Sequence, residues 1–242
     1  KGQPPTVPGP AIKVREGTKI RIHFTNKLTV PASVHPHGVK YTVSNDGAHI
    51  AGNPTSIVEP GGSRVFEWDT SGTPGNWFYH THAFEMGGDE GLYRGLWGSL
   101  IVEPKEGDPS PPDQEFVVFM HTFHVNGQEY ETFNDKSGDM EFMNGDSSAF
   151  PGLTWKVKMG EKVRFHLINS AEEMHTFHTH GHRWVDKASG ELIDNIALAP
   201  FTSYVLDFVA GEGVGPGNWA FHCHFNEHMM HGMFGIFVVE KE

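Results

Sequence analysis

An internal repeat constrains the fold of this chain more than any other feature. The sixteen residues AIKVREGTKIRIHFTN (11–26) resemble TWKVKMGEKVRFHLIN (154–169), with seven identities at an offset of 143. A second match joins PGNWFYHTH (74–82) to PGNWAFHCH (216–224) at an offset of 142. Two stretches that recur in the same order at nearly the same spacing predict two copies of one domain.

The boundary between the copies is expected in the polar, proline-rich stretch EPKEGDPSPPDQE, residues 103–115. We predict domain 1 over residues 1–104, a linker over 105–114 and domain 2 over 115–242. The first copy has no counterpart of about residues 115–142, which look like a strand and a turn. A strand of domain 2 is therefore expected to lack an equivalent in domain 1.

Both copies have the period of β-strands. Apolar and polar residues alternate in KIRIHFT (19–25) and again in KVRFHLI (162–168), as they do in half-buried strands. His23 and His166 fall on the polar face of these matching strands, so both are expected to be exposed. The 29 glycines and 16 prolines indicate many turns, and no long amphipathic helix is apparent. The pattern predicts an all-β chain of two β-sandwiches or barrels.

The only cysteine, Cys223, stands between His222 and His224, and His228 and Met233 follow it. A thiolate, imidazoles and a distant thioether are the ligands of a blue-copper electron-transfer site. The apolar residues 219–221 predict a strand, on which successive side chains point to opposite faces. Two imidazoles would then face one metal centre while the thiolate faces another. A buried structural cysteine beside chance histidines is the alternative.

Histidine is the outlier of the composition, with 17 residues against 18 lysines and arginines. The chain has five His-x-His pairs where random placement would give about one, and such clustering points to metal binding. Cys223 aligns with Thr81, and His175 aligns with Ala32, so only the second copy can build the thiolate site. Solvated strand faces are the alternative for these pairs, and zinc is the alternative metal.

Charge and composition exclude other classes of function. The net charge of −12 argues against nucleic-acid binding. No apolar run is long enough to span a membrane, so no membrane partner is expected. A single cysteine rules out an intrachain disulfide. The sequence starts without methionine, which suggests a processed or trimmed terminus.

Four motifs in order resemble the copper motifs of multicopper oxidases: HPHG (35–38), HTH (80–82), HTFHTH (175–180) and HCHFNEHMMHGM (222–233). With two domains, the chain resembles the small two-domain laccases. The resemblance implies cupredoxin-like Greek-key domains, four copper ions per chain and a secreted or periplasmic location. It also implies a homotrimer in which neighbouring subunits share each trinuclear copper cluster, because a head-to-tail contact can bring the two domain types together.

The resemblance implies a ligand set residue by residue. The type 1 copper takes His175, Cys223, His228 and axial Met233; the type 2 copper takes His35 and His178; one type 3 copper takes His37, His80 and His224, and the other takes His82, His180 and His222. Electrons would pass from Cys223 through the backbone to His222 and His224. Asp46, nine residues after His37, falls where the family has an acid that supplies protons. Its alternative role is that of a turn residue in Asp-Gly.

The function implied is a laccase-type oxidation of phenols or aromatic amines, coupled to reduction of dioxygen to water. A cuprous oxidase is one alternative, since Met229 and Met230 follow His228. A copper nitrite reductase also has two cupredoxin domains, but it would carry its thiolate in the first one. A copper carrier without turnover is the remaining alternative.

Overall fold

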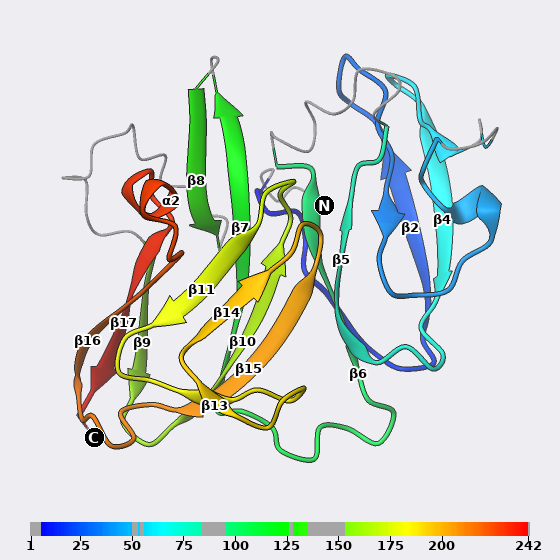
Figure 1. The fold of residues 1–242 in the computed structure, drawn as a ribbon. Coiled ribbons are helices and arrows are strands. Elements are labelled where there is room, and N and C mark those ends of the chain that lie inside the picture. The colour runs from blue at the N-terminus through cyan, green and yellow to red at the C-terminus, as the bar shows by residue number, and fades with distance from the viewer. Residues whose placement is uncertain are drawn as a thin grey trace. The chain divides into compact units, whose positions relative to one another are not determined.

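The computed structural model describes residues 6–49, 53, 56–83, 95–125, 128–134 and 153–241. The chain divides into two compact units, Lys1–Pro109 and Ser110–Glu242, at a point within the stretch 105–114. Strands make up nearly all of the regular structure, and the all-β prediction is confirmed (Figure 1). No helix among the described residues is long and apolar enough to cross a membrane.

Unit 1 contains a four-stranded and a two-stranded sheet. The first has the order β1-β6-β5-β3 and the second pairs β2 with β4. These strands are β1 (Ile12–Arg15), β2 (Lys19–Thr25), β3 (His35–Pro36), β4 (Ser63–Asp69), β5 (Gly75–His80) and β6 (Trp97–Glu103), with a 3-10 turn, η1, at Val43–Asn45. Strands β3 and β5 are antiparallel neighbours, with His35 opposite His80, so two of the His-x-His pairs meet at this edge.

Unit 2 contains a five-stranded sheet, β14-β11-β16-β17-β9, a four-stranded sheet, β15-β10-β7-β8, and the short pair β12-β13. The bounds are β7 (Gln114–Val125), β8 (Gln128–Asn134), β9 (Leu153–Lys158), β10 (Lys162–Asn169), β11 (His175–Thr179), β12 (Trp184–Val185), β13 (Leu192–Ile193), β14 (Asn195–Leu198), β15 (Ser203–Val209), β16 (Gly217–His222), α2 (Asn226–Met230) and β17 (Phe234–Glu240). Strands β11 and β16 are paired, with His178 opposite His222.

An aromatic core joins the two large sheets of unit 2. Phe165 of β10 is fully buried, and its ring packs edge-on against Phe177 of β11 and Phe237 of β17. Trp155 of β9 stacks on Phe221 of β16, with ring centroids 4.8 Å apart. Edge-to-face and stacked aromatic pairs pack favourably, and their burial supplies much of the hydrophobic stabilisation. This core fixes β11 and β16, the strands that carry the metal motifs.

The two units differ at one sheet edge. In unit 2, β7 runs parallel to β10 and covers it, whereas among the described residues β2 of unit 1 pairs only with β4. As expected, the described part of unit 1 contains no strand equivalent to β7. The prediction for His23 is correct, but that for His166 is wrong: His166 is buried because it contacts Glu115 of β7, 2.8 Å from its Nε2.

Candidate metal centres

Strand β16 delivers Cys223 into the core of unit 2. The thiol is fully buried, and its Sγ lies 3.6 Å from Nδ1 of His228, which lies 3.0 Å from Nδ1 of His175. These three ligand atoms all lie within 4.8 Å of one another. Met233 is buried in the same core cluster, and its carbonyl accepts a hydrogen bond from the Cys223 amide at 3.0 Å. The donor set fits a blue-copper ion.

The two imidazoles of this thiolate group are held neutral. Burial and the repulsion of nearby His228 lower the pKa of His175 to about 3. Burial likewise lowers the pKa of His228. A neutral imidazole has the free ring lone pair that metal binding requires. The Thr176 amide points at the sulfur from 3.5 Å, so the thiolate form also has a hydrogen-bond donor.

Four histidines of unit 2 form a second group, the unit 2 quartet: His178, His180, His222 and His224. Their neighbouring rings have centroids 5.1 to 5.3 Å apart. Nε2 of His180 lies 3.1 Å from Nε2 of His222, so the two lone pairs converge. Backbone carbonyls accept from the opposite nitrogens, Nδ1 of His178 at 2.8 Å and Nδ1 of His222 at 2.8 Å. Such contacts fix the tautomer that leaves Nε2 available to a metal.

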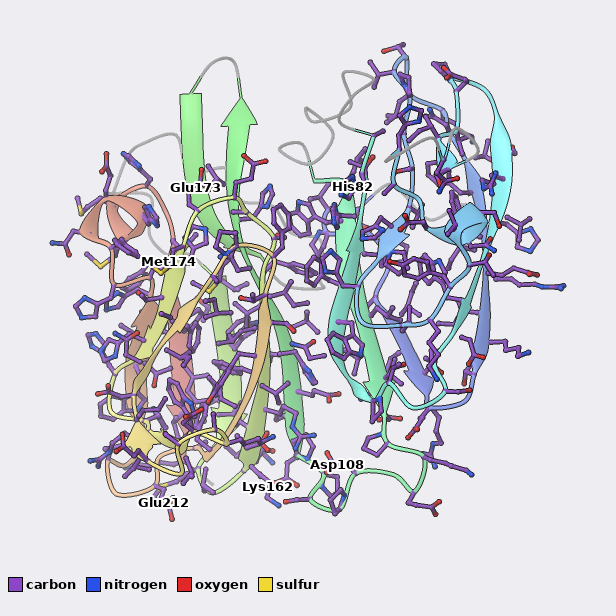
Figure 2. All side chains as sticks on the ribbon, turned by 45° about the vertical axis from the view of Figure 1, so that its right-hand side comes forward. His82, Asp108, Lys162, Glu173, Met174 and Glu212 are labelled. Atoms are coloured by element: carbon purple, nitrogen blue, oxygen red, sulfur yellow. The ribbon has the colours of Figure 1, made fainter. Side chains whose placement is uncertain are left out.

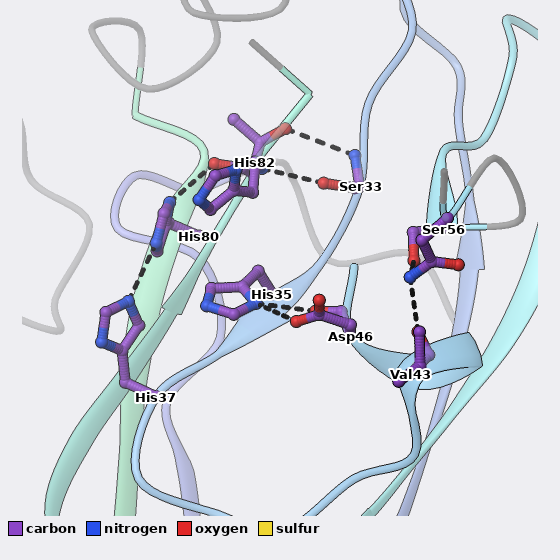
Figure 3. A network of polar contacts seen from close by, with 10 residues as sticks. Ser33, His35, His37, Val43, Asp46, Ser56, His80 and His82 are labelled. Atoms are coloured by element: carbon purple, nitrogen blue, oxygen red, sulfur yellow. Dashed lines mark hydrogen bonds and ion pairs between the residues drawn. The ribbon is translucent and has the colours of Figure 1, made fainter. Parts of the chain in front are cut away.

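Unit 1 carries the matching unit 1 quartet: His35, His37, His80 and His82 (Figure 3). Nε2 of His37 lies 3.0 Å from Nε2 of His80, whose Nδ1 donates to the Thr81 carbonyl at 2.6 Å. His37 stacks on Phe78 with centroids 4.1 Å apart. Burial, with repulsion from the neighbouring histidines, lowers the pKa of His37 to about 4 and that of His80 well below its usual value. His37 and His80 are therefore neutral at pH 7.

The structure therefore gathers the twelve proposed ligands into three groups. The thiolate group holds three of the four residues expected at the type 1 copper, and the fourth, Met233, is buried in the same core cluster. The two quartets hold the eight other histidines, and each quartet lies within one unit. His37 and His80 form the close pair of one quartet, and the resemblance assigns both to one type 3 copper. His180 and His222 form the close pair of the other quartet, and the resemblance assigns both to the other type 3 copper.

Asp46 lies against a quartet ligand. Nδ1 of His35 is 2.7 Å from the Asp46 carbonyl and 3.0 Å from its carboxylate Oδ1 (Figure 3). Tyr41, which the sequence analysis passed over, packs edge-on against His35 at 5.9 Å and lies near the Asp46 carboxylate. Burial and the Asp46 carboxylate raise the pKa of the Tyr41 hydroxyl. An acid, a phenol and an imidazole thus form one connected site.

Two hydroxyl residues that stand at equivalent positions of the two repeats were also missed in the sequence analysis. Oγ of Ser33 accepts the amide of His82 at 2.8 Å, and Oγ1 of Thr176 accepts the amide of His224 at 2.8 Å. Ser33 and Thr176 stand at the repeat offset of 143, each two residues before a motif histidine. The repeat itself was the signal that could have found them. Both fix the backbone of the second histidine in a His-x-His pair.

His182 supports the unit 2 quartet from inside the core. Its Nε2 accepts the Gly211 amide at 3.0 Å, so the proton sits on Nδ1, which donates to the His180 carbonyl at 3.1 Å. The ring is buried against Phe208 and Trp219. This side chain therefore orients the backbone of a quartet ligand without facing the metal itself.

Comparisons with known proteins agree with the donor chemistry. Residues 5–107 and 122–242 match two sequence profiles that are both described as "Multicopper oxidase". The chain belongs to the multicopper oxidases. Membership implies copper as the cofactor, and the three histidine-rich groups are consistent with it.

The relatives differ in their named activities. A "Probable nitrite reductase-hydroxylamine oxidoreductase fusion protein" of Kuenenia stuttgartiensis is 75% identical over 241 residues, covering 100% of this chain and 28% of that protein. "Hephaestin" of Mus musculus is 28% identical over 269 residues, covering 96% of this chain and 22% of its own length. The multicopper oxidase thus spans about a quarter of these curated relatives.

Solved structures share its fold. A "multicopper oxidase" crystal structure has a TM-score of 0.80 and 32% identity, and covers 97% of this chain and 79% of its own. A copper nitrite reductase from Nitrosomonas europaea has a TM-score of 0.77 at 21% identity, covering 97% and 84%, and shows likeness of fold alone. The prediction of two cupredoxin-like domains is confirmed.

Proposed function

We propose that this multicopper oxidase removes single electrons from a phenol or aromatic amine at the thiolate group and uses four of them to reduce dioxygen to two waters. The observation that carries the proposal is the place of Cys223. Its sulfur lies in the thiolate group, while the residues on either side of it, His222 and His224, lie in the unit 2 quartet. One residue of backbone therefore connects the two groups.

Copper, when bound, would accept single electrons at the thiolate group and support dioxygen reduction at the quartets. The residues of the chain position the thiolate group and shield it from solvent. His228 is half-buried and lies where an outside donor can approach, whereas Cys223 and His175 are fully buried. The hydroxyl of Thr176 binds the His224 amide and lies 3.8 Å from the Cys223 sulfur, which holds the connecting backbone in place.

Dioxygen reduction consumes protons, and we propose that Asp46 supplies them. Its carboxylate contacts His35 of the unit 1 quartet and lies near Tyr41. A carboxyl group in hydrogen-bond reach of a reacting site can act as general acid. Asp46 also follows the last residue of the η1 turn. Its backbone carbonyl hydrogen-bonds to the His35 ring as well.

We further propose four copper ions per chain and a homotrimer in which each cluster joins the quartets of neighbouring subunits. Support comes from the split of the eight imidazoles into two groups of four on separate units. Complementation tests it. A variant with His80 and His82 changed to Ala and one with His178 and His180 changed to Ala should each be inactive alone, but regain oxygen reduction when co-assembled. Inactivity of proven mixed trimers would place the cluster within one chain.

Nitrite reduction is the second candidate, favoured by the printed name of the 75% identical relative. Oxidation of a metal ion such as Fe²⁺ or Cu⁺ is the third. Oxygen uptake is measured with a phenol, with Fe²⁺ and with Cu⁺ as donor, and nitrite is then supplied in place of oxygen. Fast uptake with the phenol supports the laccase-type proposal. Turnover with a metal ion or with nitrite alone would replace it.

A further inference from the structure

The surface around His228 combines exposed apolar side chains with acidic ones. Exposed apolar side chains flank both imidazoles of the thiolate group: Met174 precedes His175 and is 50% exposed, and Met230 lies two residues after His228 and is 54% exposed. Phe225 is 40% exposed and packs on the His228 ring with centroids 5.1 Å apart. Large exposed apolar side chains gathered at one site indicate an interaction surface.

Acidic groups border these apolar side chains. Glu227 directly precedes His228, and Glu173 directly precedes Met174. Glu172 and Glu227 are exposed, and the segments 170–175 and 223–233 contain no lysine or arginine. Figure 2 shows Glu173 and Met174 together at one end of unit 2, far from Glu212. Apolar contact area with a rim of one charge suits a partner of opposite charge.

We infer that this surface, defined by Met174, Phe225 and Met230 with Glu172, Glu173 and Glu227, docks an electron-donating redox protein whose own surface is rich in lysine. The inference rests on the proposed role of the thiolate group as electron acceptor. An apolar contact beside His228 brings the donor close to the buried sulfur. The carboxylates, in a chain of net charge −12, steer a cationic partner to that contact.

In the step itself, one electron would pass from the reduced metal centre of the donor protein to the copper that Cys223, His175 and His228 would hold. No bond is made or broken and no proton moves. The imidazole of His228 would provide the path from the surface, since it is the half-buried member of the group. The donor protein is the reductant and is released in its oxidised form.

The test follows the loss of the blue copper colour without oxygen, using the copper-loaded full chain. Reduced cytochrome c, a lysine-rich haem protein, serves as the probe, and neutral hydroquinone serves as the small donor. The variant carries Glu172→Lys and Glu227→Lys. A matched control carries Glu191→Lys and Glu212→Lys, two exposed acids elsewhere on unit 2 that give the same change in net charge.

The expected result is that the Glu172 and Glu227 variant is reduced by cytochrome c about tenfold more slowly at low salt, whereas the control changes little. High salt should remove the difference. Equal rates for the two variants with cytochrome c would overturn the inference. So would an equal slowing with hydroquinone, because that would mark a change in the thiolate group itself and not in docking. A protein that takes up copper without a blue colour would refute the proposed function and the docking surface together.

Discussion

Replacing Gly181 with alanine should destabilise unit 2 more than the same change at Gly190. Both glycines have left-handed backbones, with φ of +72° and +74°, so each alanine should cost about 1–2 kcal/mol from that conformation. The two glycines differ in the space available for a Cβ atom. A Cβ on Gly181 would lie 2.7 Å from the Trp219 ring, whereas nothing lies within 4 Å of one on Gly190.

The clash sets the size of the difference. Overpacking of a fitted site costs about 1–3 kcal/mol, so the Gly181→Ala variant should lose about 1–3 kcal/mol more than Gly190→Ala. Effects on the unfolded chain are alike in the two variants and cancel in the comparison. Trp219 is half-buried and can give way in part, which favours the lower end of the range.

Urea unfolding of the copper-free protein, followed by circular dichroism, measures both variants. Equal losses of unfolding free energy would show that the Gly181–Trp219 contact does not constrain the fold. Because Gly181 lies between His180 and His182, the same variant should bind cluster copper less tightly. If Gly181→Ala loses much unfolding free energy but still binds all its copper, the turn at Gly181 does not control metal binding.

Three further predictions follow from the histidine environments. His182→Phe should leave the buried Gly211 amide without its acceptor, costing about 1–3 kcal/mol, and should lower copper affinity on dialysis against a chelator. The copper-free protein should lose stability as the pH falls from about 6.5 to 4, because His37 takes up a proton in this range in the unfolded chain but, with its pKa of about 4, not in the folded one. This site alone accounts for a loss of at most about 3 kcal/mol in unfolding free energy, measured from urea midpoints at several pH values. Asp46→Asn should leave reduction of the blue copper fast and slow the oxygen step; stopped-flow traces in which only reduction slows would refute the proton role.

The sequence predicted which histidines lie together because each motif is local. His-x-His on a strand places two imidazoles on one face, whatever the rest of the chain does. The internal repeat made the two quartets comparable and showed that only the second copy could hold Cys223. These inferences needed only the period of a strand and the chemistry of the side chains.

The supporting residues could not be predicted in the same way. His182 acts through Gly211, 29 residues away, and Tyr41 acts through Asp46, so both need the folded chain to reveal their contacts. His166 is the instructive error. Its strand has the same alternation as the strand of His23, but β7 covers it with Glu115, and alternation cannot show which strand edges are covered.

The central claim is that Cys223 belongs to one copper centre while its two neighbours belong to another. The absorption spectrum and the copper count of Cys223→Ser test it most directly. The account predicts a colourless protein that keeps the three cluster coppers and loses only the copper of the thiolate group, because thiolate-to-copper charge transfer gives the blue colour. A variant that stays blue, or one that loses all its copper, would contradict it.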